Sequence, residues 1–464
     1  MAPVVPTSEP AVAWARPMDQ RVVDAVRGHP GIHDWTIRFQ HGRGAQVYLA
    51  GTAIENVRQV ARDAYEVELF NDHQIDGQPM RGSAVIPLGR EDLDRLPAIL
   101  DDGVSMARLI HNPPWTLPDP TQHPTVELAD ERLVDAADAV REARQAAEQI
   151  RDLVAAAGPG VRLSAAELFL TAVDEDLINS RGLEVSSTST RVLSELNLLA
   201  DGEEEAEFFR QDEVRRLDDL RMPEMVREAA DHARDATHAR QARTRLGPVV
   251  LTDIAADQVF AASVLGMSSP YLTQTSAGAA YARLSQFEIG EPVFLGQPHT
   301  GDPFTLRSNA LRPFSVLSYR FDPDGLPAQD VLLIEDGVLR ARTATQRYAQ
   351  YLGLPATGQS GLAEIAPGPT PMADLLRGEP SVYQVVAFSA PNVDAVTGNL
   401  GMEIRLGYEI GPDGTRPIKG GSVTGNLFEA MAAARFSSET SQFASFAGPR
   451  AIRFESMQVA GEDA

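Results

Sequence analysis

The residues whose types and spacing best suit chemistry form a short tract near the C-terminus. Lys419 is the only lysine in the chain, and it precedes Gly420, Gly421 and Ser422. Glycines allow unusual backbone conformations and let a ligand approach the main chain closely. The N–H and C=O groups of this tract can therefore pair with an extended peptide, and the ammonium group of Lys419 can bind a carboxylate. We predict that these four residues, together with Glu403, bind substrate.

The same tract also has a purely structural interpretation. Asn426 is a favourable N-cap for a helix from Leu427 to Arg435, in which case the glycines only form the turn before that helix. Ser422 does not stand in a Gly-x-Ser-x-Gly motif, because Thr424 occupies the last position, and the only base close to it in sequence is lysine. We therefore name no catalytic residue, and both interpretations of the tract stay open.

A histidine pair invites a metal-site hypothesis. His29 and His33 have the spacing of two ligands on one helical face, but Pro30 and Gly31 stand between them and disfavour a helix. We expect no metal site here.

Two groups of acidic residues have competing interpretations. Asp253 and Asp257 are four residues apart and can hold a hard cation with waters, but helix capping by Asp253 is the favoured interpretation. His232 lies near Glu228 and Asp235, a pattern typical of surface ion pairs on a helix. We predict no metal ligands in this chain.

Composition limits the classes of function. The formal net charge is −24, from 41 basic and 65 acidic residues, so nucleic acids and anionic membrane surfaces are not expected partners. There is no cysteine, which excludes disulfides and sulfur ligands for zinc. The first 17 residues lack a basic segment followed by an apolar run, and no stretch of about 18 apolar residues occurs. We expect a cytoplasmic protein.

The patterning predicts an α+β fold. Alternating stretches such as 45–50, 65–70 and 167–199 indicate strands, and apolar residues at helical spacing from Leu133 to Val154 indicate a long amphipathic helix. The turn at 179–182 indicates a hairpin. Residues 203–219 are predicted to be a solvated connection and 223–245 a helix, and from 247 onward the chain is predicted to be β-rich.

These patterns suggest a linear series of domains. The predicted boundaries are a flexible tail (1–17), an N-terminal α+β domain (18–110), a proline-rich linker (111–125), a middle domain of helix and antiparallel sheet (126–246), and a large β-rich C-terminal domain (247–464).

Several motifs, taken in order, resemble one known family. They are Asn-Ser-x-Gly at 179–182, Leu-Ile-Glu-Asp-Gly at 333–337, Lys-Gly-Gly-Ser-x-x-Gly-Asn at 419–426 and Met-Gln-Val-Ala-Gly at 457–461. From about Ala50 to Gly461 the chain is similar to the TldD/PmbA family of peptidase-like proteins. The resemblance implies a dimer that encloses a chamber, in which a peptide is held in extended form.

The zinc motif of the active branch is missing. The resemblance implies that a TldD-type chain carries His-Glu-x-x-x-His on a helix early in the C-terminal domain, with a downstream cysteine as a further zinc ligand. Here the corresponding helix, expected at Asp253–Leu265, contains no histidine or glutamate. The chain therefore resembles the PmbA (TldE) branch, and we expect the isolated protein to retain no stoichiometric zinc.

Three functional hypotheses follow from the resemblance. The first is a noncatalytic subunit that pairs with a zinc-bearing TldD-type metallopeptidase and acts on extended peptides, for example in peptide natural-product maturation. The second is a stand-alone enzyme of small-molecule biosynthesis that reuses the chamber without zinc, with Glu403, Lys419 and Ser422 as the residues to test. The third is a binding scaffold. The sequence leaves open whether the chain forms a heterodimer or a homodimer.

Overall fold

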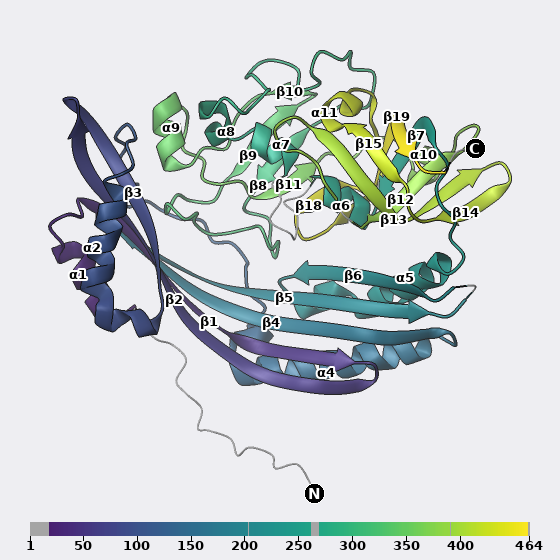
Figure 1. Ribbon diagram of the computed structural model, residues 1–464, viewed down its shortest axis with the longest axis horizontal. Helices are drawn as coiled ribbons and strands as arrows, with labels where there is room; N and C mark the ends of the chain where they lie inside the picture. Colours follow the sequence, from purple (N-terminus) through teal and green to yellow (C-terminus); the bar gives the residue numbers. More distant parts are fainter. Residues whose placement is uncertain (1–17, 203, 261–268, 390, 463–464) are drawn as a thin grey trace, which may run out of the picture. The chain divides into compact units, whose positions relative to one another are not determined.

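The computed structural model describes residues 18–202, 204–260, 269–389 and 391–462 and has the predicted α+β fold (Figure 1). The predicted tail lies outside these residues. The described residues group into two compact units. Unit 1 comprises the described residues of Met1–His41, Arg62–Pro114 and Asp174–Ser186, and unit 2 those of Gly42–Ala61, Trp115–Val173 and Ser187–Ala464. Because the units interleave along the chain, the linear domain boundaries stay a prediction.

A six-stranded sheet contributes residues to both units. Its strand order is β3-β2-β1-β4-β5-β6. The strands are β1 (Asp34–Ala50), β2 (Ala53–Ile75), β3 (Gln78–Leu88), β4 (Val161–Asn179), β5 (Glu184–Ala200) and β6 (Ala206–Val214). The predicted strands at 45–50, 65–70 and 167–199 are therefore confirmed. Strand β6 is at one end of this sheet and pairs only with β5 among the described strands.

Unit 1 combines its part of this sheet with helices α1 (Gln20–Gly28) and α2 (Leu96–Ala107) and the short 3-10 helix η1 (Arg90–Arg95). Both α-helices are amphipathic and bury apolar side chains against the strands, including Val22, Val26 and Leu100. The hairpin turn predicted at 179–182 is also in this unit. The Asn179 carboxamide oxygen accepts hydrogen bonds from two backbone N–H groups of the turn, and Gly182 supplies a φ of 89°.

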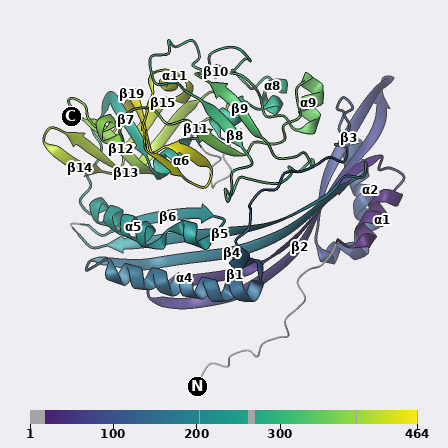
Figure 2. The same ribbon diagram turned by 180° about the vertical axis from the view of Figure 1, so that it is seen from behind.

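Unit 2 contains the helices that cover its part of the same sheet. These are α3 (Glu131–Val134), α4 (Ala136–Ala156), the 3-10 helix η2 (Leu217–Leu220) and α5 (Met222–Ala236), and Figure 2 shows α4 and α5 beside strands β4, β5 and β6. Alanine-rich faces let both helices approach the sheet closely, and they share one core with Leu168, Leu196 and Phe208. The predicted amphipathic helix is confirmed, with a break at Asp135.

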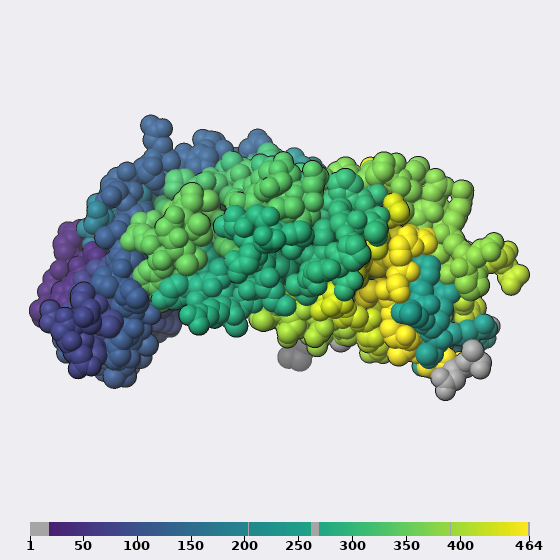
Figure 3. All heavy atoms as spheres, turned by 90° about the horizontal axis from the view of Figure 1, so that it is seen from above, coloured from purple at the N-terminus to yellow at the C-terminus, as the bar shows by residue number. Residues whose placement is uncertain are grey.

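The C-terminal part of unit 2 contains a closed five-stranded barrel, in which β12-β7-β19-β15-β13 close through β12–β13 pairing and β14 extends from β13. These strands are β7 (Arg245–Thr252), β12 (Val382–Phe388), β13 (Asn399–Gly411), β14 (Gly414–Ile418), β15 (Ser422–Asn426) and β19 (Ala451–Ala460), with the short β16 (Arg435–Phe436) pairing β19. Figure 3 shows this C-terminal part as a continuous surface in green and yellow.

A second six-stranded sheet packs with the barrel in unit 2 around one large apolar core. Its order is β10-β9-β8-β11-β18-β17, from β8 (Leu306–Asn309), β9 (Asp330–Glu335), β10 (Val338–Leu339), β11 (Leu362–Ile365), β17 (Thr440–Gln442) and β18 (Phe446–Pro449). The remaining helices are α6 (Ile254–Phe260), α7 (Pro270–Gln274), α8 (Ala277–Tyr281), α9 (Gln346–Leu352), α10 (Met372–Leu375), α11 (Leu427–Ala430) and η3 (Met431–Ala433). The predicted β-rich character beyond residue 247 is confirmed.

Two local predictions were wrong. Residues 203–219 are not a solvated connection, because they contain strand β6 and helix η2. The helix predicted to reach residue 245 ends at Ala236, and the polar stretch after it leads into β7. Polar residues dominate both 203–219 and the stretch after Ala236, so the apolar pattern of the sequence does not indicate where these elements begin or end.

Candidate functional site

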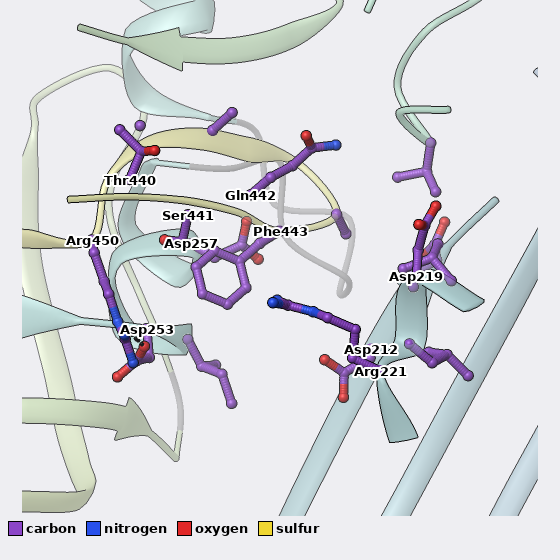
Figure 4. Close-up of a pocket in the computed structure, with 18 of the residues that line it drawn as sticks. Asp212, Asp219, Arg221, Asp253, Asp257, Thr440, Ser441, Gln442, Phe443 and Arg450 are labelled. Atoms are coloured by element: carbon purple, nitrogen blue, oxygen red, sulfur yellow. Dashed lines mark hydrogen bonds and ion pairs between the residues drawn. The ribbon is translucent and has the colours of Figure 1, made fainter. Parts of the chain in front are cut away.

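A cavity of about 1150 Å³ lies within unit 2 (Figure 4). This volume is slightly larger than that of ordinary small-molecule pockets, which enclose roughly 300–1,000 Å³. Its wall comes from β6, α5, the beginning of α6, β8, β11, β17, β18 and the loops near them. These elements are far apart in the sequence, so the cavity arises only from tertiary packing.

Two strand edges contribute to the cavity wall. Five consecutive residues of β6, Arg210 to Val214, line it, and so do all three residues of β17, Thr440 to Gln442. Successive side chains of a strand point to opposite faces of its sheet. A strand that lines a cavity with consecutive residues therefore meets it edge-on. Both strands are terminal in their sheets, so each has a row of backbone groups that no described strand pairs.

Most of the cationic side chains in the wall are neutralised by acidic partners. Six of the seven arginines that line the cavity form ion pairs. The pairs are Arg210–Asp212 (2.6 Å), Arg216–Asp219 (2.7 Å), Arg227–Glu228 (3.7 Å), Arg307–Asp330 (2.8 Å), Arg312–Glu364 (2.8 Å) and Arg450–Asp253 (3.4 Å). A ligand that needs a cation must therefore compete with an acidic side chain at each of these six positions.

Arg221 is the exception among the described lining arginines. It precedes α5 in a left-handed conformation, with φ 44° and ψ 55°. Its backbone N–H donates to the Asp218 carbonyl (3.1 Å), and its carbonyl accepts from the N–H groups of Glu224 (2.9 Å) and Met225 (3.0 Å). Its exposed side chain forms no ion pair or hydrogen bond with a described residue, and Figure 4 shows it extending into the cavity toward Phe443.

The opposite side of the cavity holds an unusual carboxyl group. Asp257 is half-buried on α6, and its Oδ1 accepts a hydrogen bond of 3.3 Å from the Ser445 hydroxyl. Burial disfavours the charged form and raises the pKa of Asp257 to about 7. Nearby on β17, the buried Ser441 hydroxyl has no hydrogen-bond partner among the described residues. Both groups line the cavity.

One buried arginine anchors the wall after β6. Arg215 is 7% exposed, and its guanidinium donates hydrogen bonds to backbone carbonyls, among them those of Ser315 (2.7 Å), Thr190 (3.1 Å) and Ser318 (2.7 Å). Desolvation lowers the pKa of Arg215 to about 10. These hydrogen bonds fix the position of Arg215, and the cavity residues Arg216, Asp219, Leu220 and Arg221 follow it directly in the chain.

The predicted substrate-binding residues come together, but they are not in the cavity wall. Glu403 on β13 lies opposite Ser422 on β15. Gly420 and Gly421 have φ of 70° and 77°, and their backbones bond to Ile404. The Lys419 ammonium lies 3.5 Å from the Glu204 carboxylate. Their binding role stays a prediction. The structural interpretation is correct for Asn426, which caps α11. It was wrong for the rest, because α11 ends at Ala430 instead of Arg435 and strand β15 separates Gly420 and Gly421 from the helix.

The histidines of the sequence patterns are placed as follows. His29 contacts Asp101 (3.0 Å), whereas His33 accepts a hydrogen bond from the Asp72 backbone (2.7 Å). The surface ion pair predicted for His232 was wrong, because this half-buried side chain packs on Phe208 with ring centroids 4.9 Å apart. Desolvation lowers the pKa of His232.

Zinc does not fit the donor groups of the described residues. No group of three or more His, Cys, Asp or Glu side chains within the described part lies close enough to hold a metal ion. Asp253 forms an ion pair with Arg450, and Asp257 accepts a hydrogen bond from Ser445. The expected helix at 253–265 is α6 as far as Phe260, and residues 261–268 lie outside the described residues.

Comparisons with known proteins agree with the motifs. Residues 245–461 match the PmbA/TldA metallopeptidase C-terminal domain. An uncharacterized protein from Methanocaldococcus jannaschii is 22% identical over 262 residues, which cover 54% of this chain and 59% of that protein. Metalloprotease PmbA of Escherichia coli is 29% identical over 147 residues, 32% of this chain and 30% of that protein. The chain thus matches less than two thirds of the length of either relative.

The fold extends the similarity to almost the whole chain. The crystal structure of TldE from Thermococcus kodakarensis superposes with a TM-score of 0.76 and 16% identity, covering 95% of this chain and 100% of that one. Among the described residues, no helix is long and apolar enough to cross a membrane. Residues 245–461 therefore match the C-terminal domain of PmbA/TldD-type metallopeptidases, and the chain as a whole is similar in fold to TldE.

Proposed function

We propose that this chain is a noncatalytic, TldE-like subunit that holds extended peptides for a TldD-type metallopeptidase partner, which carries the zinc. The observation that carries the proposal is the pair of strand edges in one cavity, β6 and β17. An extended peptide can add to such an edge through main-chain hydrogen bonds, which do not depend on its sequence. The charged side chains of β6 discourage pairing with another folded sheet but leave its backbone open to a flexible peptide.

The lack of clustered zinc ligands among the described residues supports the noncatalytic role. Metallopeptidases bind zinc through clustered histidine and carboxylate or cysteine ligands, and the described residues contain no such cluster. The chemistry of this chain is then limited to binding: it orients the peptide through backbone hydrogen bonds and leaves bond cleavage to the partner. The similarity in fold to TldE supports this division of labour.

Co-expression with a TldD-type protein that carries His-Glu-x-x-x-His tests the subunit role. We expect a one-to-one complex by native mass spectrometry, one zinc per complex, and peptide cleavage that requires both chains. Turnover of a substrate by the isolated chain would instead favour the stand-alone enzyme, and Glu403, Lys419 and Ser422 would then be the first residues to substitute. A stable homodimer without affinity for any such partner would also contradict the proposal.

A matched pair of peptides tests the mode of binding. One is a fluorescein-labelled hexapeptide of alternating serine and valine, and the other has the same sequence with alternate backbone amides methylated. Methylation removes the N–H donors that strand addition needs. We expect the unmethylated peptide to bind at least about tenfold more tightly in fluorescence anisotropy, since several main-chain hydrogen bonds are lost. Equal affinity would rule out strand addition.

A further inference from the structure

We propose that Arg221 binds the C-terminal carboxylate of the peptide in this cavity. The inference rests on the proposed peptide-binding function and specifies the end of the peptide that the chain recognises. Because the whole chain carries a net charge of −24, an anionic ligand needs a local cation. Arg221 is the described lining arginine whose guanidinium is not already neutralised by an acidic side chain.

The backbone holds Arg221 in a fixed orientation. Three hydrogen bonds of 2.9 to 3.1 Å fix its peptide groups between η2 and α5. Its φ of 44° is a conformation that costs a non-glycine residue roughly 1–3 kcal/mol. Glycine would fit this backbone without strain, so the arginine contributes something other than local stability. Because the backbone is already fixed, no main-chain entropy is lost when the side chain binds a ligand.

The surroundings of Arg221 suit the C-terminal carboxylate of a bound peptide. A guanidinium group binds a carboxylate with two parallel hydrogen bonds. In Figure 4 the Arg221 side chain extends toward Phe443, which directly follows β17, the strand that carries the unpartnered Ser441 hydroxyl. Asp257, on the same side, has a pKa raised to about 7 by burial, so its repulsion of an anionic ligand is weakened at neutral pH. A peptide on the strand edges continues directly into its terminal carboxylate, whereas an acidic side chain projects away from the backbone.

Three labelled peptides and three variants of the full-length chain test this inference by fluorescence anisotropy. The peptides are the serine–valine hexapeptide with a free C-terminus, its C-terminal amide, and an amide with one internal aspartate. We expect wild type to bind the free acid at least about tenfold more tightly than either amide. Arg221→Gln should remove this preference and leave the affinity for the amide unchanged.

Two further variants separate recognition from charge and folding. Arg227→Gln removes the same charge from the same cavity wall on α5 and should keep the preference. Arg221→Gly removes the side chain at a φ that glycine adopts without strain. Loss of the preference in this variant, with a urea denaturation midpoint no lower than that of wild type, therefore assigns the preference to the side chain.

The outcomes distinguish the inference from the proposed function. If wild type binds the free acid and the amide equally, Arg221 does not recognise the C-terminus, although the chain still binds peptides. Tight binding of the aspartate peptide would show that the cavity recognises a side-chain carboxylate and not the C-terminal carboxylate, which contradicts the inference. If wild type binds none of the peptides, both the inference and the proposed function are wrong.

Discussion

Gly421 in the barrel and Arg221 beside the cavity both have a positive φ, of 77° and 44°, but their surroundings differ in kind. A Cβ atom built on Gly421 would lie 2.7 Å from the Ala460 carbonyl oxygen, so the close approach of two barrel strands requires glycine there. Arg221 has no such constraint, because its side chain extends into a cavity.

The contrast separates two reasons for an unusual backbone conformation. In the tract from Lys419 to Ser422 the glycines satisfy the geometry of the barrel, and the lysine already has an acidic neighbour in Glu204. Around the cavity, a strained arginine, an unpartnered hydroxyl on Ser441 and a carboxyl with a raised pKa lie together. Unsatisfied and strained groups of this kind concentrate at binding sites. The cavity is therefore the stronger candidate site, and three predictions test the contrast.

The largest effect is expected at the barrel. Gly421→Ala combines a positive φ with a Cβ contact of 2.7 Å to a backbone oxygen, so we expect the free energy of unfolding to fall by about 2–4 kcal/mol. Urea denaturation measures this change. Gly401→Ala is the matched control, because a Cβ there meets no atom within 4 Å, and we expect a change within about 0.5 kcal/mol. Equal effects of the two substitutions would show that the tract is not constrained by the barrel.

A medium effect is expected at Asp257, and it depends on pH. Burial raises its pKa to about 7 in the folded protein, above the ordinary value of 3.8, so the folded state binds more protons than the unfolded state between these values. Stability from this group is therefore present at low pH and is lost as the pH rises through about 7. Asp257→Asn removes the free-energy cost of burying an ionised carboxylate, and we expect the variant to be more stable than wild type by about 1–3 kcal/mol at pH 8.

The comparison across pH supplies the control for Asp257. At pH 5 the carboxyl is protonated in the folded protein, so the advantage of the variant should be much smaller there. Burial raises the pKa of Asp322 to about 7 as well, so wild-type stability contains a second component of the same sign. The difference between variant and wild type isolates Asp257. A difference that is independent of pH would show that its charge is not the cause.

Local signals in the sequence predicted much of the fold. Alternation predicted the long strands, the Asn179–Gly182 turn predicted the hairpin, and Asn426 predicted the cap of α11. Strand β6 was missed because only Ala206 and Phe208 of its residues are buried, and most of the others are polar. An edge strand beside a polar cavity lacks the alternation by which strands are recognised.

The candidate site was much less predictable than the fold. Its wall combines residues from Arg210 to Arg450, and no short-range pattern indicates that they meet. The sequence places Arg221 just before Pro223, a residue that favours the first turn of a helix, but nothing there indicates a positive φ or an unpaired guanidinium. The site was predicted in the glycine-rich tract because glycines indicate unusual backbone conformations. Such conformations can serve strand packing as well as ligand binding, and glycine alone does not distinguish the two.

The smallest effect is expected at Arg221, and it has the opposite sign from that at Gly421. Arg221→Gly relieves the strain of a φ of 44° but gives the unfolded chain more conformational freedom, and these two effects oppose each other. Because the arginine side chain forms no hydrogen bond or ion pair with a described residue, relief of strain should dominate, and we expect a gain of about 0.5–1 kcal/mol in urea denaturation. Arg221→Ala keeps the strain and should give no gain. A loss of stability in the glycine variant would mean that the arginine stabilises the fold, and its position beside the cavity would then need no ligand to explain it.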